Sequence, residues 1–134
     1  MRSFTLEDDG YCFACGKENS SGLGLEFRSR DDMMVAEFTP LKQHQGFKNI
    51  VHGGIITTLL DEAMVKAVLS RGALAMTAEI AVRFRSPLRV GDRVVVEARI
   101  NTFGARLIEA TAVLKRANDV VAEGRAKMLL QKNI

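Results

Sequence analysis

The chain has 134 residues, of which 47% are hydrophobic, and its formal net charge is +3 at pH 7. This length suits one domain with a hydrophobic core, so we expect a single domain over residues 1–134. No run of eighteen or more apolar residues and no signal-peptide pattern occurs, which predicts a cytoplasmic protein without a membrane span. Tryptophan is absent and no dense basic cluster is interleaved with aromatic residues, so we expect no nucleic-acid partner.

The first 24 residues are rich in glycine and carry little periodic signal, which predicts an irregular N-terminal arm. Cys12 and Cys15 are the only cysteines, and we expect them to be reduced thiols that pack this arm in a cytosolic protein. A Cys-x-x-Cys pair is alternatively a redox pair or half of a zinc site. In the zinc case, the other ligands would come from His44, His52 or a second subunit.

Two short segments with alternating apolar residues follow the arm, over residues 23–27 and 34–38. Asp31 and Asp32 favour a turn between them, so the pattern predicts a hairpin of two strands that ends at Pro40. Residues 41–51 are mostly polar and are expected to form a loop.

A long helix is predicted to begin after the loop, because apolar residues recur at a spacing of three and four. A cation followed by Gly72 is typical of its end. Gly53 and Gly54 precede the first apolar turn and leave backbone N–H groups uncovered, where the helix dipole favours an oxygen that gains negative charge. Asp61 places one carboxylate inside the apolar run. The apolar positions are Ile55, Ile56, Leu59, Leu60, Ala63, Met64, Ala67 and Val68.

Four more strands are expected after the helix, over residues 76–84, 94–100, 108–114 and 122–130, with turn signals between them. The element order is therefore β-β-α-β-β-β-β. A single helix covers only one face of such a sheet, which favours an α+β fold in which a curved antiparallel sheet wraps around a long central helix.

Four segments in this order resemble the hotdog-fold acyl-CoA thioesterases of the phenylacetate-pathway and human thioesterase-superfamily type. The first is the arm motif Cys-Phe-Ala-Cys-Gly at 12–16, and the second is the loop over 45–54, which ends in Val-His-Gly-Gly. The third is Thr-Thr-Leu-Leu-Asp at 57–61, and the fourth is the strand from Thr77 with the Ser-Pro and Gly-Asp turn that follows. The resemblance covers residues 12–130 and implies a hotdog fold.

In that family the helix aspartate is the base or the nucleophile, and the glycine N–H after the loop histidine polarises the thioester carbonyl. A serine or threonine on the next strand assists. The resemblance therefore implies catalytic roles for Asp61, Gly53 and Thr77 beside His52, with Gly54 at the substrate.

One branch of the family carries an asparagine six residues before the loop histidine. This chain has Gly46 at that position, which removes a polar contact to the thioester or to water. We expect the neighbouring Gln45 to take its place.

Other interpretations of the acidic and imidazole groups remain open. Asp61 is alternatively a carboxylate at the rim of the helix beside Glu62, although a charge among apolar neighbours costs free energy unless it is paired or used. We expect His52 to fix the loop through hydrogen bonds, with a metal ligand or a general base as the alternatives.

The strand residues are also open to two interpretations. Simple alternation places Thr77 on the opposite face from Ile80 and Val82, away from the core, unless a bulge or a subunit interface brings it to the site. Otherwise Thr77 only reflects strand propensity. Arg83 and Arg85 are either a solvated strand face or ligands for the phosphates of coenzyme A.

The sequence thus predicts hydrolysis of an acyl-CoA thioester by a homodimer or a dimer of dimers, without a metal or redox cofactor. One alternative is a hotdog enoyl-thioester hydratase, which pairs a histidine with an acidic residue in a different loop pattern. The other is a non-catalytic acyl-CoA-binding protein.

Overall fold

The computed structural model describes residues 5–131 of the chain. Within them it has a long helix, α1 (Gly53–Leu69), and a short 3-10 helix, η1 (Lys42–His44). The six strands of the described part are β1 (Arg28–Arg30), β2 (Met33–Phe38), β3 (Leu74–Phe84), β4 (Val94–Phe103), β5 (Leu107–Arg116) and β6 (Asp119–Gln131).

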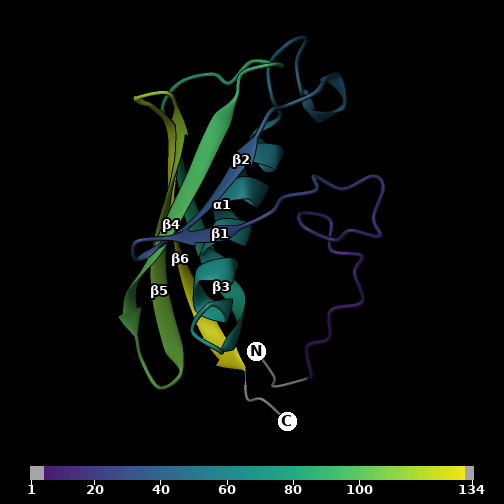
Figure 1. Ribbon diagram of the computed structural model, residues 1–134. Helices are drawn as coiled ribbons and strands as arrows, with labels where there is room; N and C mark the ends of the chain where they lie inside the picture. The colour runs from purple at the N-terminus through teal and green to yellow at the C-terminus, as the bar shows by residue number, and fades with distance from the viewer. Residues whose placement is uncertain (1–4, 132–134) are drawn as a thin grey trace.

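The strands form one antiparallel sheet in the order β1-β2-β4-β5-β6-β3. Strands β4, β5 and β6 make a meander, and β3 adds to its outer side by pairing with β6. The helix connects β2 to β3, lies against one face of the sheet and contacts every strand from β2 to β6 (Figure 1). This arrangement confirms the hotdog fold and the predicted order of elements.

Burial of the helix against the sheet supplies the core. The seven helix residues that are buried follow the predicted spacing, and β6 leaves room for them at Gly124, where an added Cβ would lie 3.4 Å from Leu60 Cδ1. Alternate residues of β4, β5 and β6 complete the core from the sheet side. The buried helix residues are Ile56, Leu59, Leu60, Ala63, Met64, Ala67 and Val68.

The predicted first strand over residues 23–27 is wrong. The first strand begins later, at Arg28, and has three exposed residues. The N–H groups of Leu23 and Leu25 donate instead to the carbonyl oxygens of Phe13 and Ala14, at 2.8 and 2.9 Å. The alternation of apolar residues is therefore used to pack the arm onto the domain rather than to extend the sheet.

The arm lies on the side of α1 away from the sheet, so the helix is covered from both sides (Figure 1). It contains no helix or strand over residues 5–27, as expected, yet backbone hydrogen bonds hold its turns together. The N–H of Gly16 donates to the carbonyl of Cys12 at 2.8 Å, and the N–H of Glu18 donates to that of Gly10 at 2.9 Å. Ala14 and Leu25 are buried in the core.

Strand β3 carries a bulge that changes which residues face the helix. In its pairing with β6, Thr77 lies opposite Met128 and Glu79 opposite Lys127, so Ala78 is an extra residue. Thr77 therefore faces the helix together with Ile80 and Val82, and the strand parity predicted from simple alternation is wrong. Ala78, which alternation assigned to the core face, is exposed.

No helix within residues 5–131 is both long enough and apolar enough to cross a membrane.

Replacement of Leu60 tests the packing between α1 and the sheet. Leu60→Ala is expected to lower the free energy of unfolding by about 2–5 kcal/mol, because Leu60 is fully buried and its removal leaves a cavity. Leu107→Ala on β5, which is 40% exposed, is the matched control and should cost much less. Urea denaturation of the three proteins measures the difference, and equal losses in both variants would contradict the packing described here.

Candidate active site

The first turn of α1 presents one backbone donor without a partner. His52 caps the helix, and its Nδ1 accepts a hydrogen bond from the N–H of Gly54 at 2.8 Å. The N–H groups of Ile55 and Ile56 bond to the carbonyl oxygen of His52. Gly53, as the first helical residue, has no intrahelical acceptor, and no group of residues 5–131 accepts from its N–H. This N–H is therefore available to a ligand at the positive end of the helix dipole.

The loop before the helix holds His52 in place. The N–H of His52 donates to the carbonyl oxygen of His44 at 2.9 Å, and His44 Nδ1 accepts from the N–H of Leu41 at 2.9 Å. His44 is 8% exposed, and burial lowers the pKa of its imidazole. A neutral imidazole keeps the acceptor nitrogen that this turn needs, so His44 holds the loop that precedes α1.

Gln45 and Gly46 shape the same loop. The Oε1 atom of Gln45 accepts from the N–H of Asn49 at 3.1 Å, and Gln45 pairs with Val51 in an isolated bridge. An added Cβ at Gly46 would lie 3.4 Å from His52 Cδ2, so the absent side chain leaves space beside the imidazole. The oxygen of Gln45 is thus engaged by the backbone, and its amide nitrogen has no hydrogen-bond acceptor within residues 5–131.

Asp61 lies two turns further along α1 and is paired with the strand. Thr77 Oγ1 donates to Asp61 Oδ1 at 2.6 Å, and the bulge at Ala78 is what turns Thr77 toward the helix. Burial raises the pKa of Asp61, the hydrogen bond from Thr77 opposes this change, and the charge of Glu62 adds to it. Asp61 is therefore a half-buried carboxylate whose pKa is raised and which accepts one hydrogen bond, from Thr77.

Gly53 and Asp61 do not converge within one chain. They are eight residues apart on the helix, which separates them by about 12 Å along its axis at a rise of 1.5 Å per residue. One carbonyl group of a substrate therefore contacts only one of them in a single protomer.

A pocket of about 290 Å³ opens beside Gly53. Its lining is mostly apolar and includes Ile50, Ile56, Pro87 and the ring of Phe84. An added Cβ at Gly53 would lie 3.5 Å from that ring, so Phe84 flanks the free N–H. Sequence analysis did not identify Phe84 as a site residue, although its position just before the Ser-Pro turn placed it at the end of the strand.

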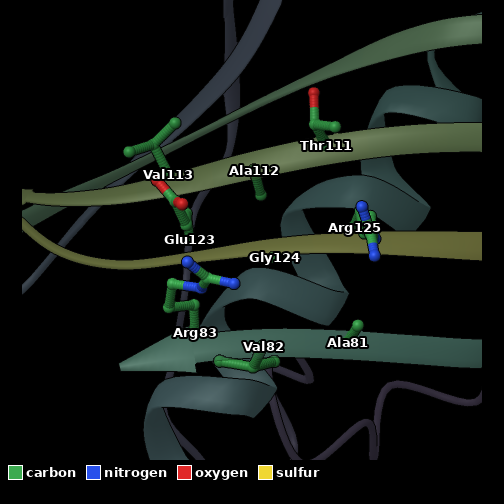
Figure 2. Close-up of a pocket in the computed structure, with 9 residues that line it drawn as sticks. All are labelled: Ala81, Val82, Arg83, Thr111, Ala112, Val113, Glu123, Gly124 and Arg125. Atoms are coloured by element: carbon green, nitrogen blue, oxygen red, sulfur yellow. The ribbon is translucent and has the colours of Figure 1, made fainter. Parts of the chain in front are cut away.

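The two predicted arginines lie in different places, because Arg83 lies on the face of the sheet opposite the helix whereas Arg85 lines the pocket beside Gly53. Arg85 Nη2 bonds to Glu123 Oε1 at 2.6 Å, and both side chains are exposed. Arg83 lies beside Glu123 in a shallow groove of about 490 Å³ between β3, β6 and β5, and Arg125 lies further along β6 (Figure 2). Two arginines and one carboxylate line this groove, so its lining carries an excess of positive charge that favours anions, and it is distinct from the pocket at Gly53.

Comparison with known proteins matches the part of the chain that contains α1 and β3 to β5. Residues 48–123, more than half of the chain, match the family model described as the thioesterase superfamily. Mouse acyl-coenzyme A thioesterase 13 is 28% identical over 98 residues, which are 70% of this chain and 70% of that protein.

Two solved structures have the same fold. Zebrafish thioesterase superfamily member 2 is 25% identical with a TM-score of 0.74, over 84% of this chain and 88% of that one. The PaaI protein of the E. coli phenylacetic acid degradation operon is 25% identical with a TM-score of 0.75, over 80% of this chain and 83% of that one. The matched family segment contains the capped helix start, Asp61 and Thr77, and the chain belongs to the thioesterase superfamily.

Proposed function

We propose that the protein hydrolyses acyl-CoA thioesters to a free acid and coenzyme A. The observation that carries this proposal is one helix with an unpaired N–H at Gly53 and a carboxylate at Asp61 held by Thr77. Thioester hydrolysis requires a hydrogen-bond donor to the carbonyl oxygen and a base or nucleophile, and these two groups can supply them. The similarity to an acyl-coenzyme A thioesterase supports the choice of substrate.

The reaction follows from the two groups. The thioester carbonyl oxygen accepts a hydrogen bond from the Gly53 N–H, which makes the carbonyl carbon more electrophilic and stabilises the oxyanion of the tetrahedral intermediate. Asp61 takes a proton from a water molecule that attacks this carbon, or it attacks the carbon itself and is released by water. The C–S bond then breaks, and the coenzyme A sulfur receives a proton.

The site is proposed to form between two protomers, since Gly53 and Asp61 of one chain are too far apart to act on one carbonyl. Strand β3 supports this arrangement because it is an edge strand of eleven residues with one side unpaired in the sheet. Antiparallel pairing of two β3 edges would satisfy those backbone groups. It would bring Gly53 of one protomer toward Asp61 of its partner in a homodimer, and two such dimers form the dimer of dimers.

The substrate is proposed to use both recesses near β3. The apolar pocket at Gly53 suits the acyl chain or the pantetheine arm. Arg85, which lines that pocket, and Arg83, in the groove on the opposite face of the sheet, are proposed to meet the phosphates of coenzyme A, for which a guanidinium is a suitable ligand.

Replacement of Asp61 tests the chemistry. Asp61→Asn keeps the size of the side chain and removes its charge, so kcat should fall at least ~10²-fold while the circular dichroism spectrum is unchanged. Release of free thiol from short, medium, long and aromatic acyl-CoAs is the assay. Asp32→Asn, an exposed aspartate in the turn between β1 and β2, is the matched control and should keep full activity. Near-native kcat in Asp61→Asn would refute the mechanism.

Replacement of Thr77 tests the hydrogen bond to Asp61. Thr77→Val removes the donor that stabilises the ionised carboxylate, so the pKa of Asp61 should rise. Because the base acts only above its pKa, the loss of kcat/KM on acidification should begin at higher pH, by roughly one unit. The pH profile of Thr102→Val, an exposed threonine of β4, should not move. A Thr77→Val profile that overlays the wild type would show that the bond does not tune the base.

Mixing of two inactive variants tests the shared site. Gly53→Val covers the donor N–H and Asp61→Ala removes the carboxylate, so a mixed dimer keeps one site with both wild-type groups. Random exchange makes about half of the dimers mixed, and activity should recover to roughly a quarter of the wild-type value. A mixture of Asp61→Ala with Asp61→Asn should recover nothing. Absence of recovery despite exchange seen by native mass spectrometry would place the whole site in one chain.

A further inference from the structure

Outside the active site, the arm and the helix bring three metal-ligating side chains together. The Sγ atoms of Cys12 and Cys15 and a carboxylate oxygen of Glu62 all lie within 4.8 Å of one another. Cys12 Sγ is 3.4 Å from Glu62 Oε2 and donates to it. The cysteines are 50 and 47 positions before Glu62 in the sequence, so only the fold makes this cluster.

We propose that Cys12, Cys15 and Glu62 bind a thiophilic divalent cation, Zn²⁺, with a water molecule in the fourth position. Two thiolates and one carboxylate are a donor set that zinc accepts. Ligand atoms on a tetrahedral zinc ion lie roughly 3.4–3.8 Å apart, as bond lengths of ~2.0–2.3 Å require. The separation between Cys12 and Glu62 already matches this geometry, and the 4.8 Å limit leaves Cys15 a short movement at most.

The backbone of the arm is built to keep the two thiols on one side. Between Cys12 and Gly16 the chain closes one tight turn through the hydrogen bond from the Gly16 N–H. A Cβ at position 16 would lie 2.4 Å from the nitrogen of Cys12 and from the oxygen of Gly10, so only glycine fits there. The turn is anchored in the core by Ala14, which is 5% exposed. The ligands are therefore pre-positioned rather than collected from a flexible tail.

Lys66 balances the charge of the proposed site. It lies one turn after Glu62 on α1 and lines the same pocket as Cys15. Two thiolates, one carboxylate, Zn²⁺ and the lysine ammonium sum to zero, so a partly buried site carries no net charge. The lysine would also act as the outer hydrogen-bond donor that orients a metal-bound thiolate.

His44 and His52, which the zinc alternative named as ligands beside a second subunit, are not part of the cluster. Nδ1 of His44 and Nδ1 of His52 each accept a backbone hydrogen bond in the loop before α1. The third ligand is Glu62, the residue directly after Asp61. A metal ion would thus fasten the arm to the helix beside the proposed catalytic carboxylate without taking part in the reaction.

The test measures zinc in the 134-residue chain, purified without chelators and reduced with a phosphine. Elemental analysis after equilibration with ZnCl₂ and desalting should give about one zinc per protomer, and the metal should raise the melting temperature. Cys12→Ser/Cys15→Ser should contain essentially none, and Glu62→Gln should bind zinc at least ~10-fold more weakly while it keeps both thiols. Glu79→Gln, an exposed carboxylate on β3, is the matched control and should bind normally.

The absorption spectrum of the protein with cobalt(II) bound in place of zinc is a second measurement, and it does not depend on stability or activity. The wild type should show thiolate-to-cobalt charge transfer in the near ultraviolet and the visible bands of a tetrahedral complex. Both should weaken in Glu62→Gln and vanish in the double cysteine variant. If the folded, reduced wild type binds no zinc, or if Glu62→Gln binds zinc and cobalt as the wild type does, the proposed site is overturned.

Discussion

The structure depends on covering a helix that is apolar around most of its surface. One face of α1 is buried by five strands of the sheet, and the other side is covered by the arm that packs through Ala14 and Leu25. The hydrophobic gain of this burial fixes the position of the helix, and the functional groups are placed as a result. Its first turn is presented at one end of the sheet, and Asp61 is held next to β3.

A carboxylate on such a helix is stable only if another group compensates for its burial. Thr77 does this through a single hydrogen bond, and the bulge at Ala78 is what makes the bond geometrically possible. The pKa of Asp61 is still raised despite this hydrogen bond, which suits the proposed role of the carboxylate as a proton acceptor. The packing of α1 and the bulge in β3 together therefore determine the environment of Asp61.

Local periodicity was sufficient to predict the helix, the five strands from β2 to β6 and the carboxylate inside the apolar run. It failed where contacts between distant segments decide the outcome. Leu23 and Leu25 alternate as a strand does, but their N–H groups are satisfied by Phe13 and Ala14 instead of a neighbouring strand.

An extra residue in a strand is also invisible to a pattern of period two, so Ala78 reversed the expected orientation of Thr77. The approach of Glu62 to the two thiols depends on how the arm crosses the helix, which no spacing within either segment encodes.

The two edges of the sheet are unequal, and this limits how copies of the chain can assemble. Edge strand β1 has three exposed residues, Arg-Ser-Arg, and its charges oppose addition of a further strand. Edge strand β3 has eleven residues and is the long edge. The proposed pairing through β3 would use the long edge of each copy and leave the short charged edge outside. Edge-to-edge association would then close after two copies and would not propagate into a fibre.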